Sequence, residues 1–510
     1  MQGPMNGETC ESRPAHRTSA GVRPRLAAIR AALVAGMLAG AGILTGTPGG
    51  VFDPSRKPQR PAYSPESSGT LAAPQHRVRR HLPKADAAGN LAQRVSHHRF
   101  PKLANELQGY FPDLGVLAEA ADWDVLVVDA ELAVNLPEYL GAMGSLRTRN
   151  PNLVILTYFS AADFIPGDLA TIRAGFAGGL DDGWFMKDTS GHRFTLFQLT
   201  PESWTEMLNL TTGVNAFMPA YLQQAVLVTG LTDGIYYDWI NDDISWLNHR
   251  TDVPCGPPDI DNDGLAEPDA ELNTLWKQGT AALLTNSRNA FPAGTIVFGN
   301  GGWVTGDTYD ALLNGMMIEQ FLEGESLGEN FGWSAVMRAY ADHASGGQQP
   351  NLSFVMANRD TRGEFAFMRF ALASTLMFDG YFCFTNRSGV YGSAWWYDEY
   401  AVNLQIGTAE RALDRKGFLG PALGEAFNAF NTQEKLRDAL AAGGTRPEQL
   451  VWRREFANGV VLVNPSPSSV HVDLAGSLRK ILGTADPTFN TGELLSSITL
   501  APRSGVILLR

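Results

Sequence analysis

Three short apolar runs of this 510-residue chain end in carboxylic acids. The acids, each with its run, are Asp129 and Glu131 (after Trp123–Val128), Asp238 (after Gly234–Tyr237) and Glu319 (after Met316–Ile318). An acid that ends a buried strand is costly to desolvate, so its presence requires a reason. Cleavage of a glycosidic bond supplies one, because it needs a protonated carboxyl for the leaving oxygen and an ionised one as nucleophile or base. We predict Glu319 as the general acid and Asp238 as the nucleophile or base. The alternative is that each acid caps the next helix or pairs with Arg338 or Arg359.

Aromatic and polar side chains accompany these acids in the sequence. Sugar rings present apolar C–H faces that stack on aromatic rings, and amide or guanidinium groups bind hydroxyls. The residues predicted to bind substrate are Asp129, Tyr158, Trp239, Asn300, Trp303 and Arg359. The alternative for each aromatic residue is that it fills the core.

An acidic stretch after Asp238 has the spacing of an oxygen-ligand calcium loop. It reads DIDNDGLAEPDAE, in which Asp259, Asp261 and Asp263 alternate and a glycine follows. Alternate acids can face one ion, and the glycine permits a sharp turn. The twelfth position is alanine, so Asp269 or Glu271 would have to close the site. We expect a structural calcium ion held by Asp259, Asp261, Asp263 and Glu271; the alternative is a solvated acidic loop.

The elements that must position these residues alternate between short apolar runs and longer amphipathic stretches. The predicted strands are Trp123–Val128, Leu153–Tyr158, Gly234–Tyr237, Ile296–Gly299, Met316–Ile318, Leu352–Met356 and Tyr381–Phe384, with a weaker one in Phe100–Leu107. The predicted helices include Pro137–Arg149, Pro201–Leu210, Ala216–Val228, Asp269–Ala290, Gly363–Met377 and a helical stretch in Thr408–Ala442. Such alternation predicts parallel strands joined by crossover helices. Because no G-x-G-x-x-G follows the first strand, we favour a (β/α)8 barrel over an open doubly wound sheet.

After about Leu450 the pattern changes to short strands separated by Gly, Pro, Asn and Ser, which is typical of a small antiparallel β-sandwich. We therefore predict an α/β protein with a barrel domain over residues 99–445 and a β-sandwich domain over residues 446–510.

Charge is distributed unevenly along the chain, whose net charge is −13. Residues 1–100 contain 14 Lys or Arg and 5 Asp or Glu, so the remainder carries about −22. Such an acidic body excludes nucleic acid as the main partner, because the phosphate backbone favours basic surfaces. Three cysteines cannot form a disulfide framework.

The first hundred residues have the composition of a leader and a linker. Arginines precede the 14-residue apolar run Ala31–Leu44, which is too short for a comfortable membrane span, so we predict a signal-like segment over residues 1–47. The alternatives are a start codon set too far upstream or an uncleaved anchor. Residues 48–98 are rich in proline and are expected to form a disordered linker. We expect a secreted or cell-envelope protein of a bacterium, with no stable membrane span in the mature chain.

From about Phe100 to Arg510 the chain resembles the hypothetical glycosyl-hydrolase-like family fifteen. The resemblance rests on DGIYYDWIND, the DxDxDG insertion followed by LWKQGTAALLTNSRN, IVFGNGGW, NGMMIEQF, WWYDEYAVNLQIG and the terminal FANGVVLVNPS and FNTGELLSSITLAPRSGVILL. It implies a (β/α)8 barrel followed by a β-sandwich, activity on glycosidic bonds of polysaccharides, and Asp238 and Glu319 as the catalytic pair.

These observations predict an exported glycoside hydrolase whose partner is a polysaccharide or oligosaccharide of the cell exterior or envelope. Two alternatives remain open. One is a non-catalytic carbohydrate-binding or scaffold protein, which would be favoured if Asp238 and Glu319 lay more than about 10 Å apart. The other is a metal-dependent hydrolase that uses Asp129, Asp238, Asp242 and Asp243.

Overall fold

The computed structural model describes residues 88–107, 113–133, 137–168, 170–200, 203–301, 308–322, 332–387 and 392–510. The predicted signal-like segment, most of the predicted linker and Trp303 lie outside these ranges.

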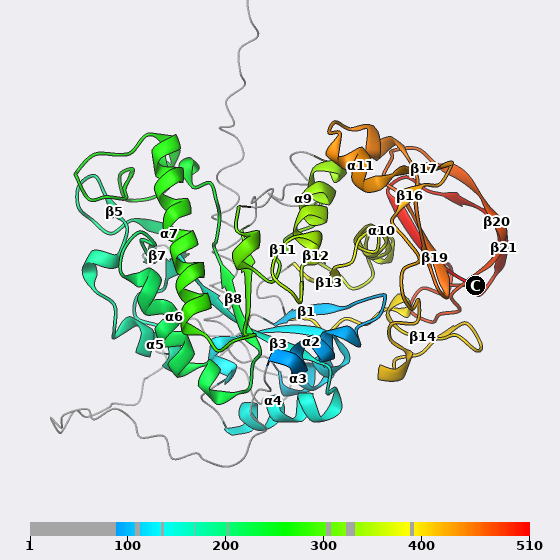
Figure 1. Cartoon of the computed structure of the whole chain (residues 1–510), viewed down its shortest axis with the longest axis horizontal. Helices are drawn as coiled ribbons and strands as arrows, with labels where there is room; N and C mark the ends of the chain where they lie inside the picture. The colour runs from blue at the N-terminus through cyan, green and yellow to red at the C-terminus, as the bar shows by residue number, and fades with distance from the viewer. Residues whose placement is uncertain are drawn as a thin grey trace, which may run out of the picture.

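In the described part of the chain, eight parallel strands form two sheets (Figure 1). The first sheet contains β1 (Ala104–Leu107), β2 (Val125–Asp129), β3 (Val154–Ser160), β8 (Gly234–Asp238) and β10 (Ile296–Asn300), in that order. The second contains β11 (Met317–Ile318), β12 (Phe354–Arg359) and β13 (Tyr381–Asn386). Isolated parallel bridges join the sheets at both ends, Gly299 with Met316 and Leu103 with Phe382. Each of the eight runs predicted as strands overlaps one of these strands, and most of the strands extend one to three residues beyond the predicted run.

Side chains from all eight strands meet in one buried cluster. Its members include Ala104, Val127, Leu156, Tyr236, Phe298, Met317, Met356 and Cys383, one from each strand. Each is at most 1% exposed. Since successive residues of a strand point to opposite faces, these residues mark the inward face of each strand.

Helices connect the strands and cover them. They include α3 (Leu114–Glu119), α4 (Pro137–Arg149), α5 (Thr171–Ala177), α6 (Val214–Ala225), α7 (Asp269–Ala290), α9 (Trp333–Ser345) and α10 (Phe365–Thr375). The bounds of α4 and α7 are those predicted from the sequence. In α7 the residues Leu272, Trp276 and Leu283 are buried, because positions separated by four and seven residues share one face of a helix.

Two segments predicted as helices have other structures. Within Pro201–Leu210 the chain forms β7 (Ser203–Met207), which pairs antiparallel with β6 (Thr195–Thr200) and β4 (Asp163–Phe164). Tertiary pairing therefore overrides the local apolar pattern. Thr408–Ala442 contains a single α-helix, α11 (Leu436–Ala441); Gly417 and Gly420 there have φ values of 63° and 72°, in a region that a helix does not allow.

The C-terminal strands are hydrogen-bonded in one antiparallel order of seven strands. They are β16 (Phe427–Asn428), β17 (Asn431–Lys435), β18 (Trp452–Phe456), β19 (Gly459–Asn464), β20 (Val470–Lys480), β21 (Leu494–Leu500) and β22 (Ser504–Leu509). The apolar side chains of this sheet divide between two clusters, one of them shared with α10. In Figure 1 this sheet, orange to red, lies beside the parallel strands with α10 between them. The sheet packs closely against α10, since a Cβ added at Gly505 of β22 would lie 2.3 Å from the Cβ of Ala373 in α10.

A helix occupies the end of the segment that sequence analysis assigned to the linker. In α2 (Ala88–Ser96), Leu91 is buried and Arg94 bonds Asp233 of the loop before β8, with Nη2 2.5 Å from Oδ1. The linker prediction is therefore wrong for residues 88–98, because a buried ion pair and an apolar contact fix this helix against the strands. Within the described residues, no helix combines the length and apolar character needed to cross a bilayer.

Candidate active site

The carboxyl ends of the eight strands carry a layer of polar residues. Two positions beyond the inward apolar residue of each strand stand Glu106, Asp129, Tyr158, Asp238, Asn300, Glu319, Asn358 and Thr385. A separation of two residues keeps a side chain on the same face of a strand, so these groups are carried by the face that lines the interior. The parallel order places all eight at the same end of the sheets, where such folds place their catalytic groups.

Asn300 connects the two acids predicted as the catalytic pair. Its Nδ2 group donates to Asp238 Oδ1 at 3.1 Å and to Glu319 Oε2 at 2.8 Å. Because both hydrogen bonds share the Nδ2 atom, the two carboxylate oxygens are at most about 6 Å apart. The structure thus brings Asp238 and Glu319 together, well inside the 10 Å limit set above.

Further donors surround Asp238, which is only 3% exposed. The Tyr158 hydroxyl donates to Oδ2 at 2.9 Å, and the backbone N–H of Trp239 donates to Oδ1 at 2.9 Å. Trp239 has a φ of 68°, a left-handed conformation that is uncommon for a bulky residue. With the Asn300 amide, three donors stabilise the charged form of this carboxylate.

Glu319 is half-buried and so more accessible than Asp238. It stands just after the end of the short strand β11. Tyr236 lies below both acids in the interior. Burial first, and then the negative charges of Glu106, Asp238 and Glu319, raise the pKa of Tyr236 well above its ordinary value of 10.0. Three carboxylates therefore act on one buried phenol.

Glu106 is a member of this polar layer that sequence analysis missed. It is completely buried in β1, whose sequence ANEL contains two polar residues in four. The missed signal is its position, because Glu106 stands two residues after the inward Ala104 of a strand that was itself predicted only weakly.

The two acids at the end of β2, Asp129 and Glu131, bind residues of α5. Arg173 of α5 donates to both carboxylate oxygens of Asp129 at 2.8 Å, and Glu131 accepts the backbone N–H groups of Ile172 and Arg173. Burial above all raises the pKa of Glu131. These acids hold α5, which is not the next helix in the chain, through Arg173, which is neither of the two arginines that the alternative named, and Asp129 remains in the polar layer. Arg173 has no local sequence signal that could have identified it.

Four of the residues predicted to bind sugars contact other parts of the protein in this structure. Trp239 is 5% exposed and packs against Phe197 and Trp246, so its ring is part of the core in this structure. The Arg359 guanidinium lies over the Phe367 ring, 3.3 Å from its centroid. Asn300 bonds the two acids, and Tyr158 bonds Asp238.

The acids of the metal-dependent alternative do not meet in one place. Asp129 pairs with Arg173, Asp242 accepts a hydrogen bond from the Thr308 hydroxyl, and Asp243 accepts from Ser245 and Asn273. Among the described residues, the one group of three acids close enough to share an ion lies elsewhere, in the loop between Asp238 and α7.

That loop gathers Asp259, Asp261 and Glu267. Of the four predicted ligands, Asp263 and Glu271 are not in the group. Asp263 Oδ1 accepts the backbone N–H of Leu265 at 2.8 Å, and Glu271 lies exposed in the first turn of α7. Glu267 takes their place.

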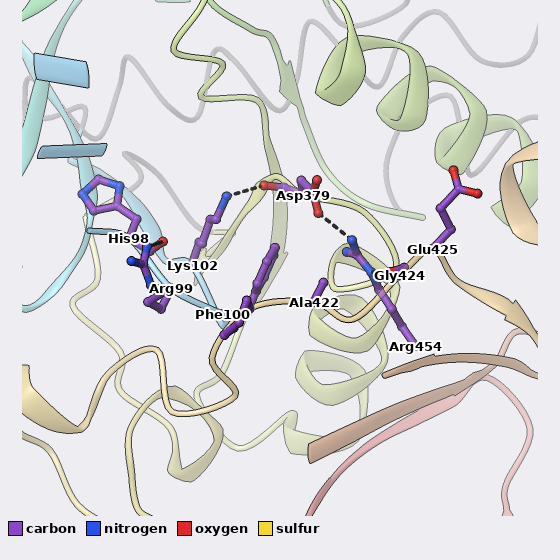
Figure 2. A pocket seen from close by; sticks show the side chains of 10 residues that line it. His98, Arg99, Phe100, Lys102, Asp379, Ala422, Gly424, Glu425 and Arg454 are labelled. Atoms are coloured by element: carbon purple, nitrogen blue, oxygen red, sulfur yellow. Dashed lines mark hydrogen bonds and ion pairs between the residues drawn. The ribbon is translucent and has the colours of Figure 1, made fainter. Parts of the chain in front are cut away.

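A pocket with a volume of about 470 Å³ lies at the opposite end of the strands (Figure 2). Lys102 precedes β1 and donates to the backbone oxygen of Asp379, which precedes β13, and Arg454 bonds the Asp379 carboxylate at 2.6 Å. Because these residues stand at the amino ends of the strands, the pocket is separate from the layer that contains Asp238 and Glu319.

The solved structures that resemble this chain do so weakly, at low sequence identity. Solved structures that resemble it include a family GH13_31 enzyme (TM-score 0.43, 11% identity, 81% of this chain and 100% of that chain). A GH31 sulfoquinovosidase from E. rectale gives a TM-score of 0.42 at 11% identity, over 83% of this chain and 65% of that one. An α-amylase from Geobacillus thermoleovorans gives 0.39 at 10% identity, over 78% and 90%. These resemblances are too weak to assign any residue a role.

A comparison with curated proteins gives no significant match. The model of hypothetical glycosyl hydrolase family 15 matches residues 147–460, which is more than half of the chain and includes Asp238, Asn300 and Glu319. The protein therefore belongs to hypothetical glycosyl hydrolase family 15.

Proposed function

We propose that this protein is a glycoside hydrolase that cleaves an extracellular or cell-envelope polysaccharide, with Asp238 and Glu319 as its two catalytic carboxyls. The observation that carries the proposal is the Asn300 amide, which bonds one oxygen of each acid from a strand between them. Two carboxyls held at a fixed, short separation at the carboxyl ends of parallel strands are the equipment that glycosidic cleavage needs. Membership of the family supports the same reaction class.

The strand order supports a closed (β/α)8 barrel as the scaffold. Each strand is next to its successor through a ladder or an isolated bridge, and the last strand meets the residue before the first. A closed ring directs the inward residues of all strands at one axis, which explains how acids from β8 and from the end of β11 can meet.

The separation of the acids favours a retaining mechanism. Retaining enzymes hold their carboxyl groups about 5–5.5 Å apart, whereas inverting enzymes leave about 6.5–9.5 Å for a water molecule. The limit of about 6 Å between the bonded oxygens lies with the first class. Asp238, charged and surrounded by donors, is the nucleophile that attacks the anomeric carbon. Glu319 protonates the leaving oxygen and then deprotonates the water that releases the sugar.

The decisive experiment is a screen of polysaccharides with the full chain, followed by acid-to-amide variants. We expect Asp238→Asn and Glu319→Gln each to abolish hydrolysis of any substrate found while their thermal unfolding stays close to that of the wild type. The matched control is Asp473→Asn, an exposed acid of β20 whose carboxylate lies 3.5 Å from His471. Proton NMR of the first product should show the anomer of the substrate if the mechanism is retaining.

Two results would contradict the proposal. Unchanged turnover in Glu319→Gln would remove it from the reaction. Tight binding of a glycan that the wild type never cleaves would identify a binding protein instead.

The signal-like residues 1–47 support export. The full chain produced in a bacterial host should be recovered outside the cytoplasm, and recovery inside it would contradict the proposed export.

A further inference from the structure

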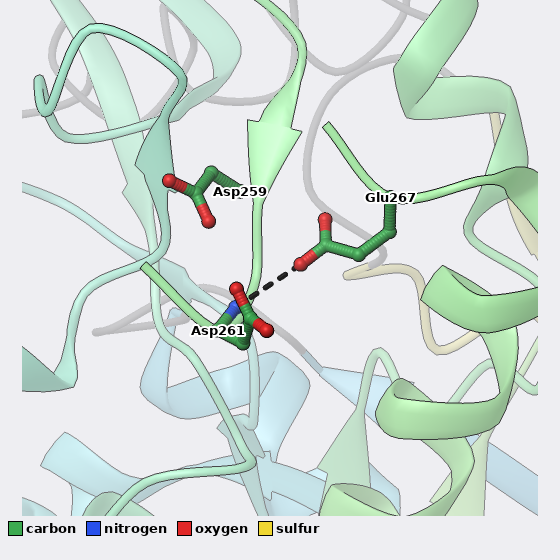
Figure 3. Close-up of side chains that lie close together, drawn as sticks. All are labelled: Asp259, Asp261 and Glu267. Carbon is green, nitrogen blue, oxygen red and sulfur yellow. Dashed lines mark hydrogen bonds between the residues drawn. The ribbon is translucent and has the colours of Figure 1, made fainter. Parts of the chain in front are cut away.

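The loop between Asp238 and α7 brings three carboxylates into one place (Figure 3). Asp259 ends β9 (Pro258–Asp259), Asp261 follows two residues later, and Glu267 precedes α7. One carboxylate oxygen of each lies within 4.8 Å of the others. Two atoms that each bind the same ion at about 2.4 Å can be no further apart than this, so the three oxygens can share one cation.

Glu267 is the unusual member of the group, because it is a buried carboxylate that is only half satisfied. The residue is 8% exposed, and its Oε1 accepts the backbone N–H groups of Ile260 at 2.8 Å and Asp261 at 3.1 Å. Its Oε2 is buried and has no hydrogen-bond partner. Burial above all raises the pKa of this carboxyl. A buried charged oxygen without a partner is costly, and a bound cation would remove that cost.

The donor set selects the chemical class of the cation. The group has three carboxylates and neither imidazole nor thiolate, so it suits a hard divalent ion. Calcium accepts several oxygen ligands in flexible geometry, whereas magnesium demands near-ideal octahedral coordination. A loop that supplies carboxylates from positions two and eight residues beyond Asp259, with water completing the shell, suits calcium better.

We propose that Asp259, Asp261 and Glu267 bind one calcium ion. The backbone prepares the site, since the N–H groups of Asp263 and Gly264 donate to the two oxygens of Asp259 at 3.1 and 2.8 Å. Gly264 has a φ of 87°, which permits the turn that returns the chain to Glu267.

The ion would tie together segments that flank Asp238. Asp259 pairs with Lys187 of β5 (Lys187–Asp188), and Asn209 donates to the backbone oxygen of Ile260 at 2.7 Å. Glu267 leads into α7, and its backbone oxygen accepts from Asn248. The ion would therefore brace the part of the loop after β8 that contacts the insertion after β3. Phe197 of that insertion and Trp246 of the loop pack against Trp239, next to Asp238.

The test measures calcium binding directly, so it does not depend on the proposed hydrolysis. The full chain is stripped with a chelator and titrated calorimetrically with CaCl₂, and with MgCl₂ in parallel, and its thermal unfolding is followed in both states. We expect one calcium ion per chain, a clear rise in Tm that chelator reverses, and at least about tenfold weaker binding of magnesium.

Variants of the loop distinguish the acids that bind calcium from acids nearby that do not. Glu267→Gln keeps the acceptor for both backbone N–H groups but removes the buried charge. We expect its metal-free Tm to equal or exceed that of the wild type, while calcium affinity falls at least about tenfold. Asp261→Asn should also lose affinity. Asp263→Asn is the matched control in the same turn, and it should bind within about threefold of the wild type.

Three results would overturn the site: no calcium heat and no change in Tm at millimolar calcium, unchanged affinity in Glu267→Gln, or a loss in Asp263→Asn as large as in Glu267→Gln. A protein that binds calcium but cleaves no glycan would refute the proposed function and leave this site intact. The reverse result would refute the site alone.

Discussion

The Asn300 amide offers the sharpest test of the proposed active site. Asn300→Ala removes a side chain that is 4% exposed and that donates to both Asp238 and Glu319. The variant leaves the two acids in place but removes the donor between them. If the pair acts as proposed, activity should fall although neither catalytic group has changed.

The expected loss follows from the charges of the acceptors. A hydrogen bond to a charged group is worth roughly 1.5–3 kcal/mol, and each 1.4 kcal/mol corresponds to about a tenfold change in rate. Each bond therefore accounts for roughly ten- to hundredfold. Losing both should lower kcat/KM by about 10²- to 10⁴-fold, mostly through kcat, because the amide orients reacting groups and need not contact the bulk of the substrate.

The assay compares Asn300→Ala with Asn150→Ala on the substrate found in the screen. Asn150 is also buried, and its Nδ2 also makes two bonds, to the backbone oxygens of Ala121 at 2.9 Å and Trp123 at 2.8 Å. It precedes β3 and so lies at the amino ends of the strands. Asn150→Ala should lower Tm while kcat/KM stays within about threefold of the wild type.

The reasoning fails if Asn300→Ala keeps activity within about threefold of the wild type. It also fails if both variants lose activity equally, because the effect would then come from general destabilisation. Circular dichroism and unfolding curves measured on both variants separate these cases from simple misfolding.

Three further predictions concern stability and calcium. Arg94→Met should lower the free energy of unfolding in urea by about 1.5–3 kcal/mol, because the buried Asp233 loses one of its two arginine partners and keeps Arg147; a change below about 1 kcal/mol would mean that α2 is not anchored. Burial tends to raise the pKa of Asp124, but Lys416 and His98 outweigh it, so that pKa lies below 3.8. The stabilisation from Asp124 is therefore complete above its unfolded pKa and lost as the pH falls through the folded value, so Asp124→Asn should be destabilised at pH 7 and its deficit should shrink below about pH 4; a constant deficit would contradict this. Because burial raises the pKa of Glu267 above 4.5, calcium affinity should decline as the pH is lowered towards that raised pKa, and a series of calorimetric titrations showing no decline would be inconsistent with Glu267 as a ligand.

The sequence allowed the acids to be predicted where an acid directly follows a conspicuous apolar run. Asp238 and Glu319 satisfy that condition, and the structure brings them together through Asn300. Glu106 does not satisfy it, because Asn105 interrupts the run before it. Contacts between distant segments could not be predicted at all: Arg173 reaches Asp129 across 44 residues, and the local sequence around Arg173 gives no sign of it.

The acidic loop shows the limit of a spacing rule. Spacing placed Asp259 and Asp261 in one cluster, but the same spacing rule added Asp263, and Glu271 was chosen to close the site because the twelfth position is alanine; neither belongs to the cluster. Whether an acid points inward depends on where the chain turns back, and here the turn at Gly264 returns Glu267 to the other two acids. Asp263 is then free to cap its own turn at Leu265.

The inward face of each parallel strand is the property that the sequence determines least. In β8 both Tyr236 and Tyr237 are completely buried, as both faces are in a parallel sheet covered by helices. Apolar patterning therefore cannot show whether Asp238 points into the interior or outward. A shift of one residue would reverse every side chain of the strand. The structure resolves this through Tyr236, which belongs to the interior cluster, whereas Tyr237 belongs to the cluster under the helices. Asp238 shares the face of Tyr236, and the same two-residue step places Asn300 above Phe298 and Glu319 above Met317. Knowing one inward residue on each strand is therefore enough to derive the whole polar layer. The apolar pattern of the sequence does not identify that residue, because both faces of these strands are buried.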